Sequence, residues 1–149
     1  QIWVAQMDEA AVRNTRDVDI ILNRDTLPAA TRALEQAGFV YQHVAGTTMF
    51  LDGPDAKAID AVHVVFAGEK VRPEYLEAVP AIDDAETIKG VRTISLESLV
   101  TMKLTLFRLK DRVHLMDMIG VGLIDQTWVE KQPDELRSRL QELIDNPDG

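Results

Sequence analysis

The chain places two carboxylates directly before an apolar run, in the stretch Arg13-Asn14-Thr15-Arg16-Asp17-Val18-Asp19-Ile20-Ile21-Leu22. In a strand, side chains two residues apart point to the same face, so Asp17 and Asp19 are expected to project together. Val18 and Ile20 are expected to be buried on the opposite face. Two adjacent carboxylates repel each other unless a cation lies between them, and Mg²⁺ accepts one or two carboxylates together with substrate phosphates. The pair therefore indicates phosphoryl or nucleotidyl transfer, although two surface aspartates are the commoner meaning of this spacing alone.

The composition is that of a globular protein. The chain has 149 residues, of which 46% are hydrophobic, and it contains no cysteine. This length fits a single domain over residues 1–149, with a sheet-bearing core over 1–94 and a helical part over 95–149. The absence of cysteine excludes disulfides and thiolate zinc sites. Neither a membrane-spanning run nor a signal peptide is present in the sequence, so we expect a cytoplasmic protein with no membrane partner.

The net charge of −9 argues against a protein that coats nucleic acid without sequence preference. Such binding depends on Lys and Arg side chains that neutralise phosphates. A locally basic cleft remains compatible with this total charge.

The first half of the chain predicts short strands around one helix. A helix is expected over 1–13, and a strand over 17–23. Asp25 or Thr26 then caps a helix with Pro28 in its first turn, which ends at Gly38. Further strands are expected over 39–44, 47–52 and 61–66, the first two forming a hairpin around Ala45-Gly46, whereas 69–90 is expected to be irregular.

The second half predicts helices. Ser95 is a good N-cap, and the helical pattern that follows it extends to about residue 119. A last helix is expected to begin at Pro133 and end near Asn146. Early strands and late helices indicate an α/β (α+β) fold, in which a small mixed sheet is flanked by helices.

Three segments in this order resemble the nucleotidyltransferase fold superfamily, in particular its small bacterial abortive-infection and type IV toxin-like members. Residues 13–19 match the R-x-T-x-D-[IV]-D signature that opens the catalytic strand. Residues 61–66 occupy the place of a later catalytic strand. Residues 96–103, followed by Arg108-Leu109-Lys110-Asp111, are similar to the L-x-x-L-[IV]-x-x-K … R-x-K-D segment. The resemblance covers roughly residues 4–117.

The resemblance implies a minimal nucleotidyltransferase fold that transfers a nucleoside monophosphate from an NTP to an acceptor. The acceptor is a tRNA 3′ end, a protein hydroxyl or a small molecule. Mg²⁺, or alternatively Mn²⁺, is implied at Asp17 and Asp19, where it neutralises triphosphate charge. Lys103 is implied to contact phosphate, and Asp111 to act near the acceptor or to orient a neighbouring group. The substrate-binding residues would be Arg13, Thr15 and Lys110.

Helix geometry is compatible with these roles. At about 100° per residue, Lys103, Lys110 and His114 share one face if the helix is continuous, and Asp111 flanks that face. A cationic stripe opposite a carboxylate pair would suit a magnesium–triphosphate complex.

Two departures from the family pattern favour an alternative. The glycine pair that usually precedes the first aspartate is either absent or lies before Gln1, because the first glycine of the chain is Gly38. His63 occupies the position of a third carboxylate, and Mg²⁺ prefers oxygen ligands, so we rank it as the weakest candidate metal ligand. The alternative is an inactive module of the same fold that binds nucleotide or a protein partner, as in a toxin–antitoxin system.

Overall fold

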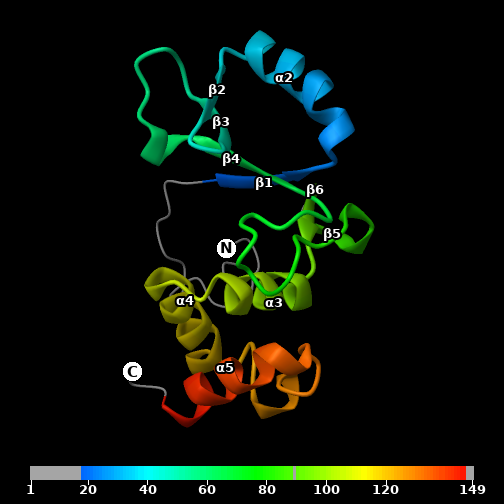
Figure 1. Cartoon of the computed structure of the whole chain (residues 1–149), viewed down its shortest axis with the longest axis vertical. Coiled ribbons are helices and arrows are strands. Elements are labelled where there is room, and N and C mark those ends of the chain that lie inside the picture. Colours follow the sequence, from blue (N-terminus) through cyan, green and yellow to red (C-terminus); the bar gives the residue numbers. More distant parts are fainter. Residues whose placement is uncertain (1–17, 89, 147–149) are drawn as a thin grey trace.

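The computed structural model describes residues 18–88 and 90–146, and this part of the chain has the predicted mixed α+β fold. It contains a four-stranded mixed sheet, a two-stranded sheet and four α-helices. Figure 1 shows the larger sheet and its helix α2 at one end of the long axis, and helices α4 and α5 at the other. The helix expected over 1–13 lies outside the described residues.

The four-stranded sheet has the order β1-β4-β3-β2. β1 (Val18–Leu22) pairs in parallel with β4 (Val62–Phe66), and β4 pairs with β3 (Thr47–Leu51) in antiparallel fashion. In this register Asp19 lies opposite His63, and His63 lies opposite Met49, so these three side chains share one face. The predicted burial of Val18 is wrong: this residue begins an edge strand and is 54% exposed.

The helix and hairpin after β1 agree with the prediction to within about a residue. α2 (Leu27–Gln36) has Thr26 as its N-cap and Pro28 in its first turn. Gly38, just beyond the helix, has a φ of 95°.

β2 (Val40–Val44) and β3 are joined by two residues with positive φ, Ala45 at 50° and Gly46 at 78°. Positive φ at both positions is the type I′ geometry that matches strand twist.

A second, smaller sheet lies within a region that was in part expected to be irregular. β5 (Ala85–Ile88) pairs with β6 (Val91–Ile94) in antiparallel fashion. Each strand has only four residues, half of them polar, which is too short a run for a clear strand pattern. Gly90, with a φ of 81° between the two strands, was the available turn signal. Short 3₁₀ turns complete the described chain: η2 (Arg24–Thr26), η3 (Ala58–Asp60), η4 (Ile82–Asp84) and η5 (Gln126–Trp128).

The last three helices form a hydrophobic core of their own. α3 (Leu96–Leu106), α4 (Leu109–Gly120) and α5 (Asp134–Asp145) contribute most of its buried side chains. Ser95 caps α3 as predicted, because its Oγ accepts a hydrogen bond of 3.1 Å from the Ser98 N–H. The helix expected from Pro133 to near Asn146 is confirmed as α5, which buries Leu136, Leu140 and Leu143. The fully buried members of the core are Val100, Leu104, Leu115, Met118, Ile124, Leu136, Leu140 and Leu143.

The helical pattern expected to extend from Ser95 to about residue 119 is broken at Phe107. This residue has a φ of 46°, in the left-handed region, so the continuous face expected for Lys103 and Lys110 does not form as such. Arg139 of α5 supplies one reason for the break: its guanidinium donates to the carbonyls of Leu104 and Thr105 at 2.6 and 3.1 Å. These hydrogen bonds satisfy carbonyls that a continuing helix would otherwise use.

None of the helices among the described residues is both long and apolar enough to cross a membrane.

We expect Ala45→Asn to stabilise the protein by about 0.5–1 kcal/mol, because Asn tolerates the left-handed backbone of a type I′ turn better than Ala does. The free energy of unfolding in urea measures the change. Ala29→Asn is the control, since Ala29 is exposed within α2 and Asn there is expected to be mildly destabilising. A lower stability for Ala45→Asn would contradict the turn geometry.

Candidate active site

Asp111 is a buried carboxylate at the first turn of α4. It is 2% exposed, and both of its oxygens bind Arg108. Its Oδ2 accepts hydrogen bonds from the Arg108 Nε at 2.6 Å and from the Arg108 backbone N–H at 3.3 Å. Its Oδ1 lies 3.8 Å from Lys103 Nζ. Asp111 therefore caps α4 and at the same time compensates two cations from either side of the helix break.

Lys103 extends from the last turn of α3 into this site, where its side chain is 16% exposed. Burial lowers the pKa of the ammonium below its ordinary value, and the nearby cations Arg108 and Lys110 lower it further. Asp111 and Asp19 oppose this effect. Because this ammonium is partly buried, water screens its positive charge only in part. It is therefore well suited to bind an anion.

Asp19 acts on the same site from the sheet. Its negative charge partly opposes the lowering of the Lys103 pKa. It also adds to the raised pKa of Arg108, for which hydrogen bonding to Asp111 is the main reason. The Asp19 side chain is 69% exposed, and its Oδ1 lies 4.0 Å from the Nδ1 of His63 on β4. An accessible carboxylate on β1 thus lies within electrostatic range of cations from the α3–α4 break.

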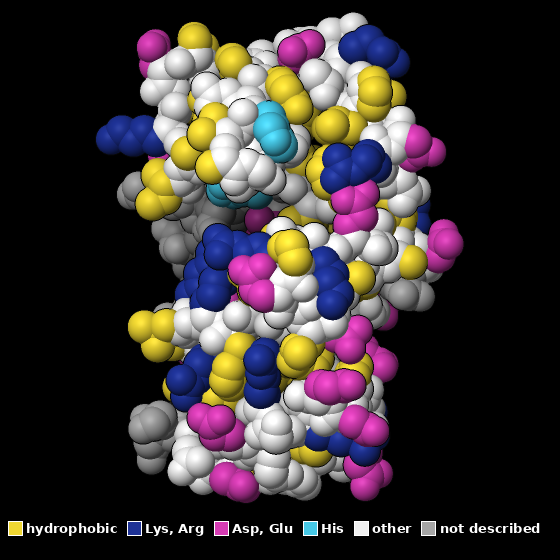
Figure 2. All heavy atoms as spheres, in the orientation of Figure 1, with side chains coloured by type: hydrophobic (Ala, Val, Ile, Leu, Met, Phe, Trp, Pro, Cys, Tyr) yellow, Lys and Arg dark blue, Asp and Glu magenta, His cyan; other side chains and the backbone are white. Residues whose placement is uncertain are grey.

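The surface around this break is strongly cationic. Figure 2 shows Lys and Arg side chains gathered near the middle of this face, next to a hollow beneath the sheet. By comparison with Figure 1, they lie where α3 meets α4. These cations gather at one place although the chain as a whole has a net charge of −9.

The structure places the described site residues that the sequence predicted at the α3–α4 break or within electrostatic range of it. Lys103 and Asp111 lie 3.8 Å apart. Asp19 on the sheet and Lys110, which is exposed at the start of α4, are both near enough to affect the pKa of Lys103. His63 is beside Asp19, as the register requires. Three predicted residues lie outside the described part of the chain: Arg13, Thr15 and Asp17.

Two residues of the site were not predicted as functional. Arg108 belongs to the R-x-K-D segment, and its spacing of three residues from Asp111 was the signal for an ion pair within one helical turn. His114 was assigned to the shared helix face but not to the site. Its Nδ1 lies 3.0 Å from Lys103 Nζ, across the helix break.

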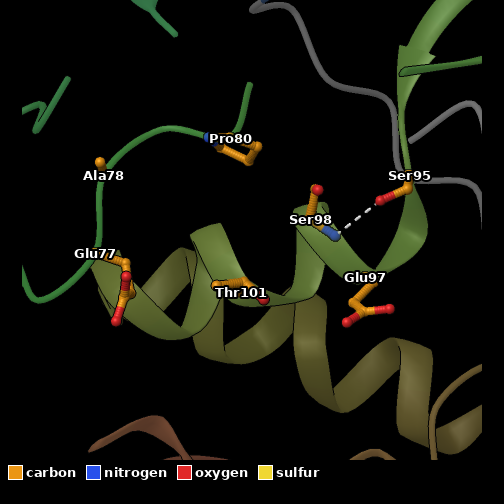
Figure 3. A pocket seen from close by; sticks show the side chains of 7 residues that line it. All are labelled: Glu77, Ala78, Pro80, Ser95, Glu97, Ser98 and Thr101. Carbon is orange, nitrogen blue, oxygen red and sulfur yellow. Dashed lines mark hydrogen bonds between the residues drawn. The ribbon is translucent and has the colours of Figure 1, made fainter. Parts of the chain in front are cut away.

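A second hollow lies at the other end of α3. It encloses about 440 Å³ and is lined in part by Glu77 and Glu97 (Figure 3). Ser95 also lines it, but its Oγ already accepts the N–H of Ser98. The acidic lining is unfavourable for phosphate groups, so we expect an anion to bind near Lys103 and not here.

Two of the predicted metal ligands, Asp19 and His63, lie among the described residues. Among residues 18–88 and 90–146, the structure holds no group of three or more His, Asp or Glu side chains arranged to bind a metal ion. Mg²⁺ does not require such a cage, because it commonly uses one or two carboxylates together with substrate phosphates and water. The exposed Asp19 carboxylate on β1 suits that kind of binding, whereas the imidazole of His63 does not.

A comparison with known protein families, curated proteins and solved structures finds no match for this chain.

We expect Asp111→Asn to lower the free energy of unfolding by about 2–3 kcal/mol, because Lys103 and Arg108 would lose their shared counter-ion. The pKa of Lys103 should fall further for the same reason. Urea denaturation measures the first effect, and NMR titration of lysine ¹³Cε signals measures the second.

Asp134→Asn is the matched control for this prediction. Its ion pair with Arg137 also spans three residues of a helix but is exposed, so a change of at most about 0.5 kcal/mol is expected. Equal losses from the two variants would show that Asp111 has no special structural role.

Proposed function

We propose that this protein is a metal-dependent nucleotidyltransferase, which transfers a nucleoside monophosphate from an NTP to an acceptor. The observation that carries the proposal is that the exposed Asp19 carboxylate lies within electrostatic range of Lys103 and Arg108. These residues come from segments that are far apart in the sequence but electrostatically coupled in the fold. Phosphoryl transfer needs a carboxylate that binds a hard cation and positive side chains that bind the phosphate groups. Asp19 can supply the first, and Lys103 and Arg108 the second.

In the proposed site, Asp17 and Asp19 would hold Mg²⁺. The ion would supply positive charge that compensates the triphosphate and the charge that develops during transfer. Lys103 and Arg108 bind the phosphate groups from the opposite side. Asp111, which is buried and paired with both cations, orients them and does not itself meet the acceptor. The residues thus act mainly by positioning and by charge compensation.

The basic surface at the α3–α4 break supports an anionic substrate on this face. Lys110 is exposed there and extends the positive surface away from Lys103. A triphosphate bound at Lys103 would lie within reach of this surface. The acceptor remains one of three classes: a tRNA 3′ end, a protein hydroxyl or a small molecule.

Titration calorimetry of each NTP, with and without Mg²⁺, tests the proposal. The wild-type protein should bind at least one NTP in a manner that depends on Mg²⁺. The Asp17→Asn/Asp19→Asn variant should lose the Mg²⁺ dependence. Lys103→Met should weaken binding about 10- to 100-fold, as expected for the loss of one hydrogen bond to a charged group.

Two variants serve as controls. Asp25→Asn removes an exposed aspartate beyond the other end of β1, and Lys131→Met removes a lysine that stacks on Trp128. Both should bind NTP as the wild-type protein does. If a folded wild-type protein binds no NTP, the enzyme proposal fails, and the alternative of an inactive module that binds a protein partner is favoured.

A further inference from the structure

The ammonium of Lys103 has two close partners on α4. Its Nζ lies 3.0 Å from the Nδ1 of His114 and 3.8 Å from the Oδ1 of Asp111. Only the first distance is that of a hydrogen bond, so the second contact acts through charge alone. Both oxygens of Asp111 are also engaged by Arg108. Among the described residues, the directional contact of Lys103 is therefore with His114.

The chemistry of the two groups determines the direction of this hydrogen bond. An ammonium has three N–H donors and no acceptor, so the Nδ1 of His114 must accept. The imidazole is then neutral and carries its proton on Nε2. A neutral acceptor places no second positive charge beside Lys103, and it leaves the other N–H donors of the ammonium able to reach phosphate oxygens.

A lysine needs such a contact if it is to bind a phosphate in one defined position. Its four-carbon stem is flexible, and a charge contact with a carboxylate does not select one direction for the N–H bonds. The break at Phe107 makes the contact with His114 possible, since it lets α4 turn back toward the last turn of α3.

We propose that His114 is a positioning residue, which holds the Lys103 ammonium in the orientation that binds a triphosphate oxygen. This inference rests on the proposed nucleotidyltransferase function and adds to it a residue that the family resemblance did not supply. A purely structural role, in which His114 only packs within α4, is the competing explanation.

Three substitutions at position 114 separate these explanations. His114→Asn keeps an acceptor, because the amide Oδ1 stands close to the place of the imidazole Nδ1. His114→Gln carries the same amide one methylene further out, and His114→Leu has no acceptor. A role in packing would make Leu and Gln the better replacements for the half-buried ring, whereas a role in positioning would make Asn the better one.

The first readout is the pKa of Lys103 itself, followed by NMR titration of the lysine ¹³Cε signals and assigned with Lys103→Arg. Loss of the acceptor should lower this pKa by about one unit in His114→Leu and His114→Gln, since a hydrogen bond to the charged form is removed. His114→Asn should stay within a few tenths of the wild-type value. Equal pKa values in all three variants would overturn the positioning role.

The second readout is NTP affinity in the presence of Mg²⁺, measured by calorimetry. His114→Leu and His114→Gln should bind about tenfold more weakly, and His114→Asn within about threefold of wild type. Circular dichroism establishes that each variant is folded, and His114→Gln decides the outcome if His114→Leu does not fold.

The outcomes distinguish this inference from the proposal on which it depends. If the wild-type protein binds NTP and all three variants bind equally well, only the role of His114 is overturned. If the wild-type protein binds no NTP, the proposed function and the triphosphate role of His114 both fail. The pKa of Lys103 then still reports whether His114 orients the ammonium.

Discussion

The buried carboxylate of Asp111 is the interaction on which the candidate site depends. It lies at the point where α3 ends and α4 begins, and it caps the new helix through the Arg108 backbone N–H. The same carboxylate binds the Arg108 guanidinium and lies 3.8 Å from the Lys103 ammonium. Two cations this close would repel each other in a partly buried setting. The helix break and the cationic surface are thus stabilised by one group.

The sheet and the helices make different contributions to the site. The sheet presents Asp19 on an edge strand, where the side chain is accessible and lies beside His63. The helices present Lys103 from a largely buried position, which strengthens its charge toward an anion. The cations gather at one place in a chain of net charge −9, so the overall charge gives little guide to the potential at the site.

The sequence pattern predicted one continuous helix where the structure has α3 and α4, and the cause of this difference is tertiary. Residues 96–119 have a helical pattern throughout, and no glycine or proline marks the break at Phe107. The break is held from outside, by Arg139 of α5 on the carbonyls of Leu104 and Thr105. A partner contributed by a segment more than thirty residues away does not appear in a local pattern. The contact of Lys103 with His114 depends on the same break.

The amino-acid sequence was sufficient to predict the mixed α+β class, the hairpin at Ala45-Gly46 and the cap at Ser95. These features follow from local periodicity, turn chemistry and residue spacing, which act over a few positions. The tertiary structure was needed to show that Asp19 lies within electrostatic range of Lys103, that α3 and α4 are separate helices, and that His114 contacts the Lys103 ammonium. Such contacts arise from the packing of whole elements against one another, and the burial that gives Lys103 its chemical character exists only once that packing has formed.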